Sequence, residues 1–535
     1  MPRLVEARRF ASAKSVSVAL GMIAVTLVVA VIHFFVVGFG AIRFPFGIDY
    51  GEGIVWQQMR MIMAGHGYAP LGSFPAIVFH YPPLYHVLTG LAARATDSDE
   101  LATGRAVSLV STIAAAALLA VLTSTNRGPM EPRLPYRLGG LAAAAIWLAT
   151  QPVMLWAYLF RVDPLFLAFS FGGVWLGILS LTRPIAIYGA ALLFVAALFT
   201  KQTALAAPSA VFAVLLVAQP RTAAKGIITG LVAALAALAA VVDLTHGGFL
   251  KHIILYNINR FDPQKWSYLL KELGYHCGLL AAALWAIRRR WKTLHLSGDA
   301  STLIGRLRSD PAAAAFCILV LYFLLTTIML GLVFKSGSAL NYFLEWLGLV
   351  SSFVGLEIAD MLARLRAPGA NAIGAGEVVL LWALALQLVL LVLLVKLDFN
   401  DRVHDRRDLE RLQTLIVAAP RPVIGDDMVA ILRAGKPVLW EPSIFTELAA
   451  KGVWDERPFL AMIRAHRFAF FVSEDPGSAK YDSRHSPGVR QALAAAYPQV
   501  RYLAQYELRF PAGPLPADAA SLPRRFVNHH AMGTN

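Results

Sequence analysis

The first residues that could do chemistry are two carboxylates, Asp49 and Glu52, in the stretch FPFGIDYGEGIVWQQ that follows a long apolar segment. Three residues apart, they can share one face of a short helix that begins near Gly51. Carboxylates serve as general bases in enzymes, but acids also favour the N-terminus of a helix as caps. The nearby glycines let the backbone fold tightly around an acid, which favours a functional role.

Three single cations stand at the ends of apolar segments: Arg161 in FRVDP, Lys201 in FTKQTALAAP and Lys335 in FKSGS. Arg and Lys are suited to bind phosphate, although long cationic side chains also snorkel from apolar segments to lipid headgroups. We predict that the three bind a phosphate carried by a lipid, with Arg161 and Lys201 contributing most.

Further polar side chains are expected to line a cavity near these cations. The segment FHYPPLYHVLTGLAAR, residues 79–94, has an extended entry fixed by two prolines and then an aromatic helix at headgroup depth. The segment SALNYFLEWLGL, residues 338–349, places an Asn and a Glu at i and i+4 where an apolar helix starts, and such groups usually line a cavity. The residues expected in the cavity are His80, Tyr81, Tyr85, Asp163, Gln202, Asn341 and Glu345.

The composition places these residues in a membrane protein. Of the 535 residues, 57% are hydrophobic and only 15% are charged, whereas soluble domains have about 25% charged residues. Apolar runs long enough to cross a hydrocarbon core of about 30 Å recur along the chain. We predict a polytopic α-helical protein with eleven spans, at 15–39, 104–124, 138–158, 163–181, 185–200, 203–218, 225–243, 268–287, 312–334, 340–362 and 376–397.

The basic residues indicate which way the chain crosses the membrane. The net charge of +15 comes largely from Arg and Lys in alternate short loops, such as NRGPMEPRLPYR and RRRWKTLHLSGDASTLIGRLR. Short basic loops stay in the cytoplasm, so the N-terminus, residues 1–14, is expected inside and the loop 40–103 outside a plasma (inner) membrane. Asp49 and the three cations then all face outward. This distribution makes the lipid bilayer the expected partner and argues against nucleic acid.

The chain changes character after the last predicted span. The region 398–515 has ordinary polarity and short β-like runs, RPVIG, KPVLWEP, RFAFFVSE and VRYLAQYELRF, between helix-like stretches. It is long enough for a small α/β domain on the outer side of the membrane. The last residues, 516–535, are expected to be disordered. Cys277 and Cys317 lie in apolar segments and are not expected to form a disulfide.

Taken in their order along the chain, the motifs resemble those of the GT-C superfamily of membrane glycosyltransferases. The shared features are an N-terminal span, an outward loop with an Asp and a nearby Glu, a PPL-Y segment, an R-x-D-P turn, and the TKQT and NYFLEW segments. They extend over roughly residues 40–400, and look like the bacterial branch similar to aminoarabinose transferases and dolichyl-phosphate-mannose mannosyltransferases. The resemblance implies a GT-C-like transmembrane catalytic domain over 15–397.

The resemblance also implies transfer of a sugar from a polyprenyl-phosphate donor to a lipid, glycan or protein acceptor at the outer face. By analogy, Asp49 is the catalytic base, and Glu52 assists it or positions sugar hydroxyls. Related transferases often have a Lys before the paired prolines, whereas this chain has FHYPP, with His80 and Tyr81 as substitutes. The D-x-D pattern of metal-dependent members is missing around Asp49 (GIDYGEG), so the motif does not support use of a divalent metal, and no cofactor is expected. Such a reaction needs one base and cations that stabilise the leaving phosphate.

Three other functions stay open at this point. A glycan ligase or polymerase would also act at the outer face, and the sequence separates it poorly from a glycosyltransferase. A transporter for a lipid-linked saccharide would need ionisable or helix-breaking residues deep in several spans, but midspan positions here are mostly Ala, Leu, Val and Gly. A sensor with a ligand-binding tail would not need eleven spans. An inverting glycosyltransferase is therefore the leading interpretation.

Overall fold

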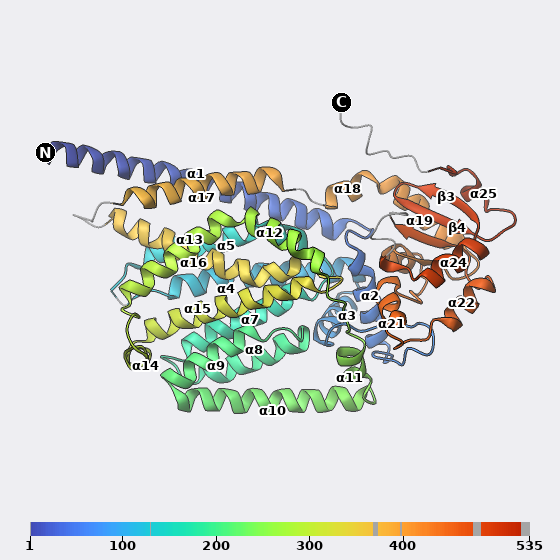
Figure 1. Ribbon diagram of the computed structural model, residues 1–535, viewed down its shortest axis with the longest axis horizontal. Helices are drawn as coiled ribbons and strands as arrows, with labels where there is room; N and C mark the ends of the chain where they lie inside the picture. The colour runs from blue at the N-terminus through green and yellow to red at the C-terminus, as the bar shows by residue number, and fades with distance from the viewer. Residues whose placement is uncertain (1, 129, 367–372, 396–397, 475–482, 526–535) are drawn as a thin grey trace.

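The computed structural model describes residues 2–128, 130–366, 373–395, 398–474 and 483–525. Long helices lie side by side in one bundle, and a smaller domain with a β-sheet covers one end of it (Figure 1). Among the described residues, six helical segments are long and apolar enough to cross a membrane. The protein is therefore a multi-pass membrane protein, as predicted.

The helices of the bundle follow the predicted apolar segments. They are α1 Pro2–Arg43, α4 Glu100–Thr125, α5 Arg133–Ala149, α6 Gln151–Trp156, α7 Asp163–Leu179, α8 Ala186–Thr200, α9 Ala206–Ala218, α10 Pro220–Leu244, α12 Trp266–Tyr275, α13 Cys277–Thr293, α15 Pro311–Met329, α16 Leu344–Arg366 and α17 Ala375–Leu394. Shorter elements connect them: α11 Gly248–Leu250, η1 Lys251–Leu255, η2 Pro263–Lys265, α14 Ala300–Ser309, η3 Leu330–Phe334 and η4 Leu340–Phe343.

Each of the eleven predicted spans coincides with one of these helices or with a broken pair. The span 138–158 is divided between α5 and α6, and the span 268–287 between α12 and α13. Helices α7, α8 and α9 have 17, 15 and 13 residues, fewer than the roughly 20 that a full crossing needs. The count of eleven crossings therefore stays a prediction.

Small residues bring the central helices of the bundle together. Helix α16 packs against α5, and a Cβ on Gly139 would lie 2.3 Å from the carbonyl oxygen of Gly355. A Cβ on Gly355 would in turn lie 2.4 Å from the carbonyl oxygen of Gly139. Membrane helices use such positions to approach closely. Helix α10 lies at the edge of the bundle (Figure 1) and exposes large apolar side chains, which suits contact with lipid: Ile228, Leu231, Val232 and Leu235.

The loop 40–103 forms two helices at one end of the bundle, α2 Tyr50–Met63 and α3 Leu84–Thr96. Most of α2 is buried because the C-terminal domain packs directly on it. A Cβ on Gly53 would lie 2.5 Å from the Cβ of Met428. The backbone of α2 at Gly53 therefore contacts the Met428 side chain of the C-terminal domain directly. This loop, which is called the outward loop after its predicted side, is therefore enclosed between the bundle and the C-terminal domain.

The C-terminal domain has a four-stranded sheet in the order β1-β2-β4-β3. Strand β1 is parallel to β2, and the other two pairs are antiparallel. The strands are β1 Ile424–Gly425, β2 Phe471–Glu474, β3 Gln499–Leu503 and β4 Tyr506–Phe510. The described helices are α18 Asp398–His404, α19 Arg406–Ala418, α20 Met428–Arg433, α21 Pro442–Ala450, α22 Arg457–Arg464, α24 Pro487–Ala496 and α25 Ala517–Ala520. This is the kind of small α/β fold that the sequence predicts for this region.

Two segments of this region differ from the prediction. The run KPVLWEP forms no strand of the sheet: the Ala76 N–H donates to the Leu439 carbonyl at 2.9 Å, so the run pairs with the outward loop instead. Its two prolines cannot donate to a sheet, which favours this isolated pairing. The predicted disordered tail begins with helix α25 and the buried Leu522. Residues 526–535 of that tail lie outside the described residues.

Candidate active site

A cavity of about 510 Å³ lies where the outward loop and the C-terminal domain meet the ends of the bundle helices. Its walls come from parts of the chain that are far apart in sequence. The predicted site residues that line it are Asp49, His80, Tyr81, Arg161, Lys201, Gln202 and Lys335. One carboxylate and all three predicted phosphate-binding cations are thus brought to one cavity.

Asp49 is both the N-cap of α2 and a wall of this cavity. Its Oδ2 atom accepts a hydrogen bond from the Gly51 N–H at 2.8 Å and pairs with Nη2 of Arg161 at 2.5 Å. A Cβ on Gly51 would lie 2.1 Å from the Arg161 guanidinium, so only glycine leaves room for the pair. The side chain of Asp49 is 24% exposed. The helix-cap and the functional interpretations of Asp49 are therefore compatible.

Glu52 lies outside the cavity and is fully buried. Both of its oxygens pair with Arg105, at 2.8 Å to Nε and 2.7 Å to Nη2. Its carboxylate also accepts hydrogen bonds from the backbone N–H groups of Ile48 and Phe160. Burial by itself would raise the pKa of Glu52, but the Arg105 guanidinium and these N–H donors outweigh it and hold the pKa below its usual value. In this structure Glu52 holds the outward loop in place rather than facing a substrate.

Arg161 and Lys201 each contact an acidic partner. Burial alone would lower the pKa of Arg161, but Asp49 raises it above the usual value, so Arg161 stays charged. Lys201 is 4% exposed and its Nζ lies 2.6 Å from Oδ1 of Asp163. The same Asp163 oxygen accepts a hydrogen bond from Asn341 at 2.9 Å. The charges of both cations are therefore partly compensated inside the protein.

Lys335 differs from these two cations. It lines the cavity at the end of η3, and its backbone is held because its carbonyl accepts from Nζ of Lys265 at 2.7 Å. Within the described part of the chain, its ammonium has no ion-pair or hydrogen-bond partner. Lys335 is therefore the lining cation best able to take an added phosphate.

The segment around the paired prolines forms another wall. Nε2 of His80 lies 3.3 Å from Oε2 of Glu441, and the His80 carbonyl accepts from Gln202 at 2.8 Å. Burial, with a smaller contribution from Asp163, raises the pKa of Tyr81 to about 12. Tyr81 therefore stays protonated and can donate a hydrogen bond to a ligand.

The other predicted cavity residues do not line the cavity. Asp163 and Asn341 lie directly behind Lys201 and position it. The Tyr85 hydroxyl donates to the Gly104 carbonyl at 3.0 Å, because that face of α3 packs against α4. The Glu345 carboxylate, in the first turn of α16, accepts a hydrogen bond from Tyr322 and is buried in the bundle.

Sequence reasoning missed the residues that the C-terminal domain adds to the cavity. They are Glu441, Ser443, Ile444, Glu447, Ser483 and Arg484. Arg484 lies over the ring of Tyr50 at 3.9 Å and pairs with Glu474 at 3.2 Å. Glu441 precedes the Pro-initiated helix α21, and this signal predicts a helix start without indicating that the start faces a cavity. Among the described residues, no group of three or more His, Cys, Asp or Glu side chains could hold a metal ion.

No protein-family model and no curated protein matches the sequence. Solved structures do match. ArnT from Cupriavidus metallidurans bound to undecaprenyl phosphate has a TM-score of 0.57 at 13% identity, over 91% of this chain and 99% of that one. Its apo state gives 0.57 at 14% with the same coverage. The archaeal oligosaccharyltransferase AglB from Archaeoglobus fulgidus, in complex with an inhibitory peptide and a dolichol-phosphate, gives 0.50 at 11%, over 93% and 75%. This chain has the GT-C fold.

The GT-C fold predicted from the order of the motifs is thus confirmed. In this chain, the fold directs the N-terminal ends of α2 and α7 toward the candidate cavity, since Asp49 caps α2 and Arg161 directly precedes α7. The N-terminus of a helix carries a partial positive charge. Because Asp49 and Asp163 already stand at these two helix starts, Lys335 is the lining cation that is best able to meet an anion such as a phosphate.

Proposed function

We propose that this protein is an inverting glycosyltransferase that moves a sugar from a polyprenyl-phosphate donor to a cell-envelope acceptor at the outer face of the plasma membrane. The observation that carries the proposal is the cavity in which Asp49 lies beside Arg161, with Lys201 and Lys335 in the same walls. The GT-C fold supports it, because ArnT, which has a similar structure, is bound to undecaprenyl phosphate.

In the proposed reaction, Asp49 accepts the proton of an acceptor hydroxyl. The oxygen attacks the anomeric carbon of the donor from the face opposite the phosphate, which inverts the configuration. The bond from the anomeric carbon to the phosphate oxygen breaks, and its electron pair leaves with the polyprenyl phosphate. The transition state resembles an oxocarbenium ion, and nearby cations stabilise the charge that develops on the leaving phosphate. We propose that Lys335 does this, whereas Arg161 pairs with Asp49 and holds the base in position.

The C-terminal domain is proposed to hold the sugar or the acceptor. It covers the cavity with two carboxylates, Glu441 and Glu447, and the hydroxyl of Ser443. Such groups suit the hydroxyls of a carbohydrate, because carboxylates accept hydrogen bonds and a serine hydroxyl can both donate and accept them. Glu441 also pairs with His80 of the outward loop, so the domain is joined to the cavity wall by its polar residues.

The proposal is tested by mass spectrometry of the cell-envelope glycans from a deletion strain, compared with the same strain carrying the wild-type chain. Loss of one sugar substituent supports the proposal, whereas loss of a whole glycan favours a ligase or polymerase. In parallel, binding of undecaprenyl phosphate to the purified protein is measured in detergent. Unchanged glycans together with no binding of this probe would overturn the proposal.

Lys335→Ala is expected to weaken undecaprenyl-phosphate binding by about 10- to 100-fold. A hydrogen bond to a charged group contributes about 1.5–3 kcal/mol, and 1.4 kcal/mol corresponds to a factor of ten. The side chain has no protein partner among the described residues, so its loss should not unfold the protein. Lys335→Arg keeps the charge and should bind almost normally. Lys451→Ala, on the exposed surface of the C-terminal domain, is the matched control. Equal binding by all variants would show that Lys335 does not bind the donor phosphate and that its side chain only snorkels to lipid headgroups.

The proposed orientation is tested by single cysteines in a Cys277→Ser, Cys317→Ser background. We expect Lys451→Cys to react with a membrane-impermeant maleimide once any outer barrier has been made permeable. Ser297→Cys, in the basic loop before α14, should react only after the plasma membrane itself is opened. Both positions are exposed, so burial does not limit either reaction. The reverse pattern would place the candidate cavity on the cytoplasmic side and contradict the proposed function.

A further inference from the structure

A second large cavity, of about 630 Å³, lies at the opposite end of the bundle from the candidate active site. Helix α7 connects the two: Asp163 at its start supports Lys201, and Leu179 at its end lines the second cavity. A helix of 17 residues is about 25 Å long at 1.5 Å per residue. The second cavity is therefore separate from the proposed chemistry.

Three arginines give this cavity a basic wall: Arg127, Arg133 and Arg137. Its lining contains one acid, Asp310, which caps α15 and pairs with Arg306 at 3.4 Å. In the described part of the chain, Arg133 and Arg137 have no acidic partner. They stand at i and i+4 on α5, and like charges at this spacing destabilise a helix unless something compensates them. An anion in the cavity would provide that compensation.

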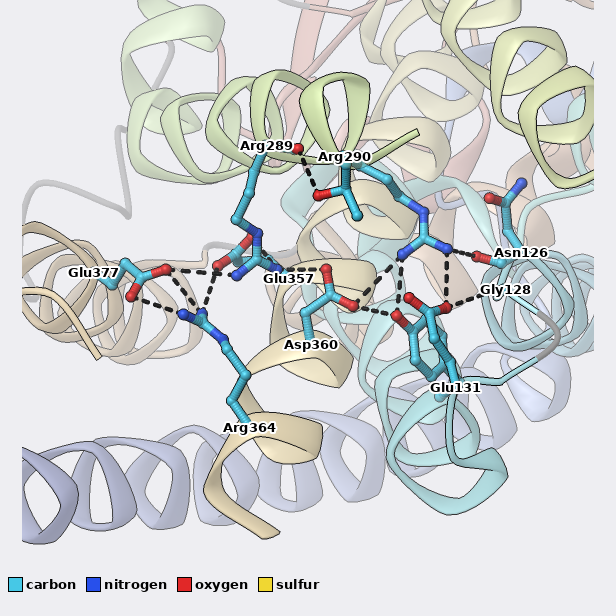
Figure 2. A network of polar contacts seen from close by, with 11 residues as sticks. Asn126, Gly128, Glu131, Arg289, Arg290, Glu357, Asp360, Arg364 and Glu377 are labelled. Atoms are coloured by element: carbon cyan, nitrogen blue, oxygen red, sulfur yellow. Dashed lines mark hydrogen bonds and ion pairs between the residues drawn. The ribbon is translucent and has the colours of Figure 1, made fainter. Parts of the chain in front are cut away.

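The loop that carries Arg127 is held by a partly buried ion-pair network (Figure 2). Arg290 is 5% exposed; its Nη2 donates to the Asn126 carbonyl at 2.7 Å and lies 3.2 Å from Oε2 of Glu131. The same Glu131 oxygen accepts from the Gly128 N–H at 2.5 Å. The Glu131 carboxylate thus forms its ion pair with Arg290. Among the described residues, the Arg127 guanidinium contacts only the backbone carbonyls of Gly128 and Glu131, and no acidic side chain there neutralises its charge.

The remaining walls of this cavity are apolar or carry hydroxyl groups. Trp175, Ile178 and Leu179 of α7 face it together with Ala312 and Ala315 of α15. Ser124, Thr125 and Thr182 add hydroxyl donors beside the arginines. A free inorganic anion would gain nothing from contact with the apolar walls. A lipid, in contrast, would place its acyl chains against these walls and its phosphate among the arginines.

We propose that this cavity binds the phosphate headgroup of an anionic phospholipid in the leaflet opposite the candidate active site. Arginine suits phosphate because its planar guanidinium donates two parallel hydrogen bonds. Basic pockets between membrane helices at a cytoplasmic surface are known to take such headgroups, and the proposed orientation places this cavity there. Basic loops that serve topology alone need charge but do not need a cavity with apolar walls.

The test uses the full chain with both arginines changed, Arg133→Gln and Arg137→Gln. Both side chains are exposed, so the variant should fold. Lipid binding is followed by native mass spectrometry and by the shift of the thermal unfolding midpoint, with phosphatidylglycerol as the probe and phosphatidylcholine as the neutral comparison. The matched control is Arg221→Gln with Arg288→Gln, two exposed arginines outside the cavity. All proteins also carry Lys335→Ala, to reduce binding at the candidate active site.

We expect phosphatidylglycerol to bind the control at least tenfold more tightly than the Arg133/Arg137 variant, and phosphatidylcholine to bind neither well. Equal binding of phosphatidylglycerol to both proteins would overturn the proposal and leave the arginines with a role in topology only. Stabilisation by inorganic phosphate that equals the effect of phosphatidylglycerol would overturn it in another way, because the ligand would then be a soluble anion.

Discussion

Asp49→Asn is expected to lower the rate of sugar transfer by about 10²–10⁴-fold, the usual loss when proton transfer to a positioned base is removed. Both hydrogen bonds to this carboxylate end on Oδ2, from Gly51 and from Arg161. Oδ1 accepts from neither of these two groups, and we propose that it receives the proton of a substrate hydroxyl. Asparagine has the same size and can still accept the Gly51 N–H, but it has no basic oxygen for the proton.

The structure makes this test sharper, because Asp49 is also a helix cap. Asparagine caps a helix as well as aspartate does, so loss of capping cannot explain a large effect. Asp299→Asn is the matched control: Asp299 caps α14 through the Thr302 N–H at 3.0 Å and lies far from the cavity. Transfer is measured with the natural donor in membranes, and thermal unfolding is measured in detergent. Near-normal transfer by the Asp49 variant would falsify its assignment as the base.

The fold could be predicted because its signals are local. Runs of about 20 apolar residues indicate membrane helices directly, and the order of Asp49, the paired prolines and the R-x-D-P turn indicated the GT-C fold. The break at Thr150 is accompanied by Pro152 in the first turn of α6, whereas no proline marks the break at His276. Local patterns therefore predicted which segments are helical better than where each helix is interrupted.

The candidate site was predicted less completely because its contacts are long-range. The i and i+3 spacing placed Asp49 and Glu52 on one helix, but it could not reveal that Arg105 approaches from 53 residues away and removes Glu52 from the cavity. In the same way, nothing near Glu441 indicates that it meets His80, 361 residues earlier in the chain. Residue type suggested which groups were polar and unusual, whereas packing decided which of them face the cavity.

Helix-end cations illustrate the same limit. Arg161, Lys201 and Lys335 look alike in sequence, each at the end of an apolar segment. The structure distinguishes them by their neighbours, since Asp49 contacts the first and Asp163 the second. Cations that are already paired inside the protein position the site, and the cation without a partner is the one proposed to bind donor phosphate.

Glu52→Gln is expected to destabilise the protein by about 3–5 kcal/mol, the usual cost of removing one partner of a buried ion pair. Arg105 is fully buried, and it also donates to the carbonyls of Ala41, Phe44 and Phe46. Without the Glu52 carboxylate its charge would be left uncompensated. The loop that ends at Asp49 would then lose its main anchor, so transfer should fall together with stability.

The measurement is a double-mutant cycle on the thermal or denaturant unfolding of Glu52→Gln, Arg105→Gln and the double variant in detergent. We expect the double variant to lose less stability than the sum of the single losses, because removing both charges leaves neither unpaired. Glu100→Gln is the control: Glu100 pairs with Arg60 at the partly exposed surface, where an ion pair contributes about 0–1 kcal/mol. A Glu52 variant of unchanged stability that has lost transfer would contradict this role, and Glu52 would then have to act on the substrate itself.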